Sequence, residues 1–205
     1  MQISLIHFLN FCLGSMILFP ASSCLLYKKV EKEKFGHVFT GSFIFLSVFF
    51  YYMYREVFSF TNSAPQPMFV LISVLVSIIC IASESLIVLI KNKKFSVQRI
   101  KTDSLILLLF VLLVIPVMEE FLFRRYLFAF FQSLDVHISI IIILSSVAFG
   151  LNHLVYSKIN VLTKMIWGCM FALLYYYTDN IFYPIFSHVL CNIIVFIIGK
   201  VWRQK

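Results

Sequence analysis

Seven apolar runs, most of them close to the length that crosses a membrane, fill nearly all of this chain of 205 residues. They cover residues 3–27, 36–54, 68–90, 103–118, 138–155, 161–178 and 181–199. A helix needs about 20 apolar residues to span the hydrocarbon core of a bilayer. Only 13% of the residues are charged and 61% are hydrophobic, whereas a soluble domain carries about 25% charged residues. The sequence therefore predicts an all-α, polytopic bundle of about seven to eight transmembrane helices.

The connections between the runs are short, and none has the composition of a linker or of a soluble domain. We therefore expect one membrane-embedded domain over residues 1–205. An apolar stretch with two arginines, 119–133, directly follows the fourth run and lies just after Pro116. Because proline kinks helices, this stretch either prolongs the fourth run or forms a separate interfacial or re-entrant helix.

The net charge of +8 comes from short basic clusters that separate the apolar runs. These clusters lie at 28–34, 91–101 and 200–205. Basic loops mark the cytoplasmic side of membrane proteins, so the third and seventh runs are both expected to end there. A nucleic-acid partner is not expected, because no basic face or aromatic reader motif accompanies the charge. The Ile-, Lys-, Phe- and Tyr-rich composition is typical of an AT-rich bacterial genome, which favours a bacterial plasma membrane.

Three polar segments interrupt the apolar pattern in the second half of the chain. They read Glu119-Glu120-Phe121-Leu122-Phe123-Arg124, Phe149-Gly150-Leu151-Asn152-His153 and His188-Val189-Leu190-Cys191-Asn192. Ionisable residues inside apolar runs are costly, and they usually face the bundle interior and mark a functional site. The outer residues of the second and third segments are four apart, a spacing that places them on one helix face. The three segments therefore predict polar groups directed toward a shared interior.

The first segment suggests two roles for its neighbouring carboxylates. Glu120 and Arg124 are four residues apart with the acid first, which is the favourable order for an ion pair on one helix face. Glu119 is rotated by about 100° around the helix axis and faces away from Arg124. A carboxylate held away from water is suited to accept a proton. We therefore predict Glu119 as a general base and Glu120 with Arg124 as a supporting pair.

The other two segments supply what a hydrolytic site also requires. Glu119 and His153 are predicted to hold and deprotonate a water molecule, and His188 and Asn192 to donate hydrogen bonds to the developing oxyanion. No recognisable nucleophile motif pairs a serine or cysteine with a histidine. Direct attack by water is therefore favoured over an acyl-enzyme, and no cofactor or metal is expected.

The pattern E-E-x-x-x-R, F-x-x-x-H and H-x-x-x-N resembles the motifs of the CAAX-protease and bacteriocin-processing family, or Abi family, of intramembrane glutamic endopeptidases. The type II CAAX prenyl endopeptidases are its eukaryotic relatives. The resemblance covers residues 119–192 and implies a fold of about eight helices with the motifs around a central intramembrane cavity. It implies the same roles for Glu119, His153, His188 and Asn192, with Glu120, Arg124 and Phe149 in support. Many members have glycine after the motif arginine, where this chain has Arg125.

The sequence thus favours a multi-pass endopeptidase of the cell membrane. Its expected substrate is a membrane-associated peptide or protein, of the kind met in bacteriocin or signal-peptide processing or in self-immunity. One alternative is a zinc metalloprotease with Glu119, His153 and His188 as ligands. Another is a bacteriocin-immunity or peptide-binding membrane protein that uses the same cavity without catalysis.

Overall fold

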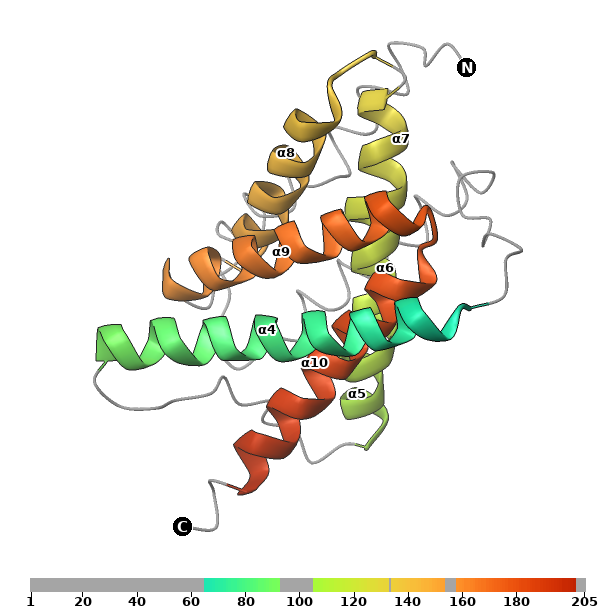
Figure 1. Ribbon diagram of the computed structural model, residues 1–205. Helices are drawn as coiled ribbons and strands as arrows, with labels where there is room; N and C mark the ends of the chain where they lie inside the picture. The colour runs from blue at the N-terminus through green and yellow to red at the C-terminus, as the bar shows by residue number, and fades with distance from the viewer. Residues whose placement is uncertain (1–64, 93–104, 133, 154–157, 202–205) are drawn as a thin grey trace. The chain divides into compact units, whose positions relative to one another are not determined.

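The computed structural model describes residues 65–92, 105–132, 134–153 and 158–201 (Figure 1). Within these ranges the chain forms helices joined by turns and contains no strand, which confirms the all-α class for this part. The first two predicted spans, 3–27 and 36–54, lie outside the described residues. The same is true of the basic cluster at 28–34 and of most of the cluster at 91–101.

The helices follow the predicted apolar runs from the third run onward. In chain order they are α4 (Pro67–Asn92), α5 (Leu105–Leu109), η2 (Phe110–Val114), α6 (Ile115–Glu120), η3 (Phe121–Tyr126), α7 (Leu127–Gln132), α8 (Ile138–Leu151), α9 (Lys158–Thr178) and α10 (Phe182–Val201). The turns after α7 and α9 contain Asp135 and Asp179 with positive φ angles of 56° and 45°. Aspartate tolerates this left-handed conformation because its short side chain bonds locally to the backbone.

Two of the described helices are long and apolar enough to cross a bilayer. They are Pro67–Ile90 of α4, with a mean hydropathy of 2.5, and Phe182–Lys200 of α10, with a mean hydropathy of 1.9. α8 has 14 residues and ends at Leu151, before the expected boundary at 155. At about 1.5 Å per residue it is roughly 21 Å long, shorter than a ~30 Å hydrocarbon core. The count of seven to eight spans stays a prediction.

The chain is helical throughout Leu105–Gln132, so the described part of the stretch, 119–132, continues the helical path of the fourth run. Two π-helical segments, η2 and η3, lie on either side of α6, which carries Glu119 and Glu120. Pro116 lies in the first turn of α6, where its missing N–H matters least. The wider turn of the π-helix that precedes it accommodates a ring that would clash with an ordinary α-helical turn. The local irregularity predicted from Pro116 is therefore a change of helix type.

The chain divides into two compact units, each built from separate stretches of sequence. The described residues of the first unit are those of 122–168, and the described residues of the second unit are those of 65–121 and 169–201. The first unit holds α7, α8 and most of α9, and the second holds α4, α5, η2, α6 and α10.

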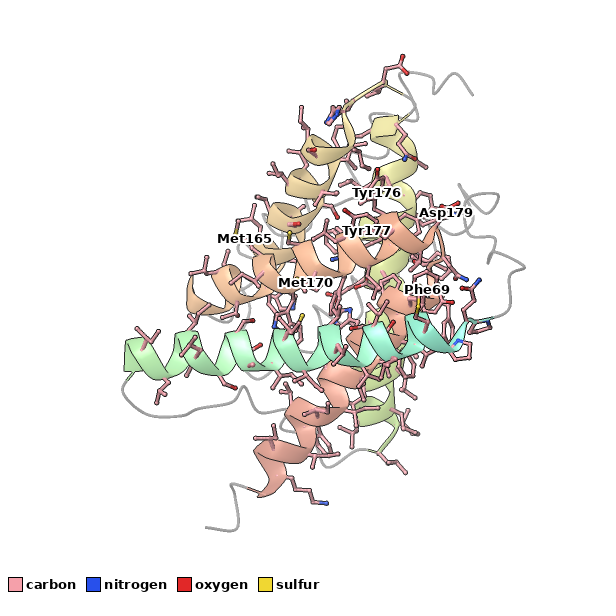
Figure 2. The ribbon with its side chains drawn as sticks, in the orientation of Figure 1. Phe69, Met165, Met170, Tyr176, Tyr177 and Asp179 are labelled. Carbon is pink, nitrogen blue, oxygen red and sulfur yellow. The ribbon has the colours of Figure 1, made fainter. Side chains whose placement is uncertain are left out.

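The core of the second unit is the contact between α4 and α10. Phe69 near the start of α4 (Figure 2) packs edge-on against Tyr183, with ring centroids 5.4 Å apart. Further along both helices, Ser77 bonds to Ser187 and the Cys191 thiol donates to Ser77 O. The two helices therefore run in the same direction, as expected for two spans that each end at a basic cluster. Their small contact residues, four apart on each helix, allow the backbones to approach closely.

The first unit depends on close contact between α8 and α9 at two glycines. A Cβ atom on Gly150 would meet the Met165 side chain and would lie 2.6 Å from the Val161 carbonyl oxygen. A Cβ atom on Gly168 would lie 3.1 Å from Ser146 Cα and 3.2 Å from Phe149 Cβ. Both helices thus pack backbone against backbone at this crossing, and the contact fixes the position of Phe149.

Candidate active site

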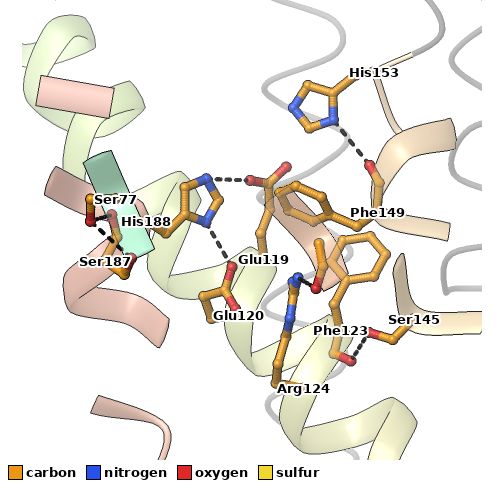
Figure 3. A network of polar contacts seen from close by, with 11 residues as sticks. Ser77, Glu119, Glu120, Phe123, Arg124, Ser145, Phe149, His153, Ser187 and His188 are labelled. Carbon is orange, nitrogen blue, oxygen red and sulfur yellow. Dashed lines mark hydrogen bonds and ion pairs between the residues drawn. The ribbon is translucent and has the colours of Figure 1, made fainter. Parts of the chain in front are cut away.

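The second unit brings both motif carboxylates to one histidine ring. His188 on α10 has Nδ1 2.7 Å from Glu120 Oε1 and Nε2 3.6 Å from Glu119 Oε2 (Figure 3). Glu120 is fully buried, and Glu119 and His188 are only 5% and 3% exposed. An ionised carboxylate can only accept, so with Glu120 ionised the 2.7 Å contact requires a proton on Nδ1. The second distance is longer than a direct hydrogen bond.

Phe171, on the part of α9 that belongs to the second unit, covers one face of the same ring. Its ring stacks on His188 with centroids 5.1 Å apart and an angle of 28° between the planes. Phe171 is fully buried. The imidazole is therefore held by a charged hydrogen bond at one edge and by an aromatic face, which leaves its Nε2 edge directed at Glu119.

Asn192 lies on α10, one helical turn beyond His188, and is half-buried. Residues four apart on an α-helix lie on the same face. The predicted placement of His188 and Asn192 on one helix face therefore follows from the regular helix that carries both residues.

The first unit holds the motif arginine in a closed aromatic environment. Arg124 is fully buried, and its Nη2 donates to the Gly168 carbonyl at 3.0 Å. Its guanidinium carbon lies 4.7 Å from the centroid of the Phe149 ring and 5.7 Å from that of Phe123. Cation–π contacts of this kind strengthen when water is excluded. Phe149 thus supports the arginine directly.

His153 lies in the turn that follows α8, rather than on the helix as the four-residue spacing had suggested. The physical reason is that α8 ends at Leu151, and the backbone N–H of His153 bonds to the Gly150 carbonyl. His153 Nδ1 still lies 3.0 Å from the Phe149 carbonyl oxygen, and the two rings are 5.3 Å apart. Phe149 and His153, predicted only to share a helix face, are therefore in contact, although the helix does not continue to the histidine.

Residues 101–194 match the family model described as type II CAAX prenyl endopeptidase Rce1-like. The segment resembles that family, and we call it the Rce1-like domain. The match confirms the family resemblance of the three motifs, since all of them lie inside it, and the family is membrane-embedded. No curated protein and no solved structure matches the chain.

Within the Rce1-like domain, the structure brings together some predicted partners and leaves others as predictions. Glu119 and Glu120 meet at His188, a contact that the sequence had not assigned to Glu120. The predicted water shared by Glu119 and His153 would join residues of the two units, as would the predicted pair of Glu120 and Arg124. Both of these pairings, and the central cavity, stay predictions.

Several residues that support the Rce1-like domain could not be found from its motifs. Phe171 and the Gly168 carbonyl lie in an apolar helix that carries no motif residue. Ser145 on α8 donates to the carbonyl of Phe123 at 2.8 Å, so it helps to hold the segment that carries Arg124. In α4 and α10, the four-residue spacing of small residues is a signal from which the close helix contact could have been predicted, although it was not. These supports arise from tertiary packing rather than from a sequence pattern.

Proposed function

We propose that this chain is an intramembrane endopeptidase that hydrolyses a membrane-associated peptide or protein by direct attack of water. The observation that supports this proposal best is the buried arrangement of Glu119, His188 and Glu120. Buried ionisable groups are rare unless they serve a function, and a cluster of two carboxylates and an imidazole can both accept and return protons. The Rce1-like match supports the endopeptidase class independently of this geometry.

In the proposed mechanism, Glu119 removes a proton from a water molecule that His153 also holds. The water oxygen attacks the scissile carbonyl carbon, and the carbonyl oxygen gains negative charge. Asn192 and His188 donate hydrogen bonds to that oxygen. His188 does so through Nε2, which requires the doubly protonated ring, because Nδ1 already donates to Glu120. Glu119 then passes its proton to the leaving amine as the carbon–nitrogen bond breaks, so the site returns to its starting charge.

The position of Glu120 gives this proposal a detail that the motif alone did not contain. By accepting from Nδ1, Glu120 orients the imidazole, in the way that a carboxylate orients a catalytic histidine in hydrolases. Rotation of the ring would then break a charged hydrogen bond, so Nε2 remains directed at the same place. In this proposal Arg124, which lies in the next helical segment η3, offsets the negative charge of Glu120.

We further propose a multi-pass location in a bacterial plasma membrane and a substrate of the bacteriocin, leader-peptide or signal-peptide kind. The first part of this proposal rests on the apolar runs and basic clusters, together with two helices of spanning length. The substrate class rests on the family resemblance and on the AT-rich composition of the chain.

One geometric observation favours zinc chemistry as the second candidate. A zinc-ligating histidine usually donates one ring nitrogen to a carboxylate while the other nitrogen binds the metal. In this chain, Nδ1 of His188 contacts Glu120, and Nε2 faces a second carboxylate, that of Glu119. Two ligand atoms that each lie about 2.0–2.1 Å from a zinc ion are roughly 3.3 Å apart, close to the 3.6 Å between His188 Nε2 and Glu119 Oε2. Such a site would also need His153 as a ligand, and the described residues, His153 among them, contain no cluster of three or more metal-ligating side chains.

The proposed function is tested by incubating the purified full chain, in lipid nanodiscs, with a library of membrane-anchored peptides. Mass spectrometry identifies each product and therefore the bond that was cut. We expect cleavage within or beside a membrane segment by the wild type, and none by Glu119→Gln at equal folded concentration. Saturable peptide binding without any product would instead support the immunity or binding function.

A further inference from the structure

A pair of buried hydroxyl groups joins the two helices of spanning length beside the candidate site. Ser77 Oγ on α4 lies 2.9 Å from Ser187 Oγ on α10 and 3.1 Å from the Ser187 carbonyl oxygen (Figure 3). Ser187 Oγ also lies 3.1 Å from the carbonyl oxygen of Ser73. All three serines are fully buried. We call Ser77 and Ser187 the hydroxyl pair.

One member of the hydroxyl pair, Ser187, is adjacent in sequence to the proposed catalytic histidine. Ser187 directly precedes His188 on a regular helix, so the two side chains are about 100° apart around the axis of α10. Ser187 faces α4, and His188 faces α6 through its bond to Glu120. A rotation or a shift of α10 would therefore change both contacts together.

The hydroxyl pair can fix the rotation of α10 because its bonds have direction. Each serine has one hydroxyl proton, and both protons can be used when Ser77 donates to Ser187 Oγ and Ser187 donates to the Ser73 carbonyl. Apolar contacts between helices in lipid have little preference for one rotation, because lipid tails are as apolar as the side chains. Hydrogen bonds between backbone and side chain supply that preference.

We propose that Ser77 and Ser187 are positioning residues, which set the rotation and height of α10 so that His188 Nδ1 meets Glu120. The proposal rests on the proposed function, because it assigns importance to the orientation of His188. α4 lies outside the Rce1-like segment at 101–194. The inference therefore extends the active-site support to a helix that the family match does not include.

The proposal is tested by nuclear magnetic resonance of the full chain in lipid nanodiscs, labelled with ¹⁵N-histidine. A short bond from Nδ1 to a buried carboxylate gives a low-field, slowly exchanging proton signal, which is assigned by its loss in His188→Asn. We expect that signal to be lost in the double variant Ser77→Ala with Ser187→Ala. The low-field signal should remain in Ser83→Ala, the matched control, because that hydroxyl donates to the Cys80 carbonyl of its own helix.

Alanine is nearly as small as serine, and single hydrogen bonds between membrane helices stabilise modestly, so we expect the variants to fold. If the double variant does not fold, Ser187→Ala alone decides, because it removes both bonds of the Ser187 hydroxyl to α4, while the Ser77 hydroxyl can donate to the Ser73 carbonyl of its own helix instead. A folded variant that retains the wild-type His188 signal would overturn the positioning role. The spectra are recorded without substrate, so a wild type that cleaves nothing would contradict the proposed function and leave this result valid.

Discussion

His188 Nδ1 lies 2.7 Å from Glu120 Oε1, and 68 residues of sequence separate the two side chains. Glu119, the residue directly before Glu120, is the proposed base. The charged hydrogen bond therefore connects the two motif helices α6 and α10 within the second unit, and it explains why two adjacent carboxylates can have different roles.

Replacing Glu120 with glutamine is expected to destabilise the fold and to reduce activity. A neutral amide oxygen still accepts from Nδ1, but a charged acceptor in a buried site is worth about 1.5–3 kcal/mol. The measurement is the melting temperature in detergent together with the yield of folded protein. Asp135→Asn, an exposed turn position where asparagine tolerates the positive φ angle, is the control and should match the wild type. A melting temperature for Glu120→Gln equal to that of the control would show that the contact contributes nothing.

The sequence predicted the helical class and the family resemblance, because both depend on local information. Apolar runs of spanning length and ionisable residues inside them are visible without a fold, and the helices α4 and α10 begin within a residue or two of the predicted runs. The end of α8 before His153 was not predicted, because an apolar run can continue past the last helical turn. Neither the partner of Glu120 nor the stacking of Phe171 was predictable, since both depend on contacts between distant helices.

The close crossing of α8 and α9 predicts different effects for two glycine substitutions. Gly150→Ala places a methyl group against the Met165 side chain and the Val161 carbonyl, so overpacking should cost about 1–3 kcal/mol. A Cβ atom on Gly199 would meet no atom of the described residues within 4 Å, so Gly199→Ala should stabilise α10 by roughly 0.5–1 kcal/mol through helix propensity. Thermal unfolding of both variants in the same detergent provides the comparison. Equal stability of the two variants would contradict the tight crossing.

A double-mutant cycle tests the predicted ion pair of Glu120 and Arg124. If the two side chains interact, Glu120→Gln and Arg124→Gln should be non-additive by about 1 kcal/mol or more in unfolding free energy. The same cycle with Arg125→Gln, a half-buried neighbour of the same charge, serves as the control and should be additive within about 0.5 kcal/mol. Additive effects in the Arg124 cycle would show that Glu120 and Arg124 do not form an ion pair.

Metal removal separates the two chemical candidates for the site. If Glu119 and His153 activate the water without a metal, 1,10-phenanthroline should leave the initial cleavage rate unchanged, and the purified chain should not contain stoichiometric zinc. About one zinc ion per chain, with activity that is lost on chelation and restored by added zinc, would favour the metalloprotease. Elemental analysis and the initial rate should be obtained from the same preparation.

The rate of peptide cleavage by Glu119→Gln tests the central claim most directly. The substitution keeps the size of the side chain and removes the carboxylate that accepts the proton from water, whose contribution as a general base is about 10²–10⁴-fold. The measurement is the single-turnover rate on a membrane-anchored peptide that the wild type cleaves, at equal folded concentration and with matching melting temperatures. We expect a rate at least about 100-fold below that of the wild type. A folded Glu119→Gln that cleaves at the wild-type rate would contradict the role of Glu119 as the general base.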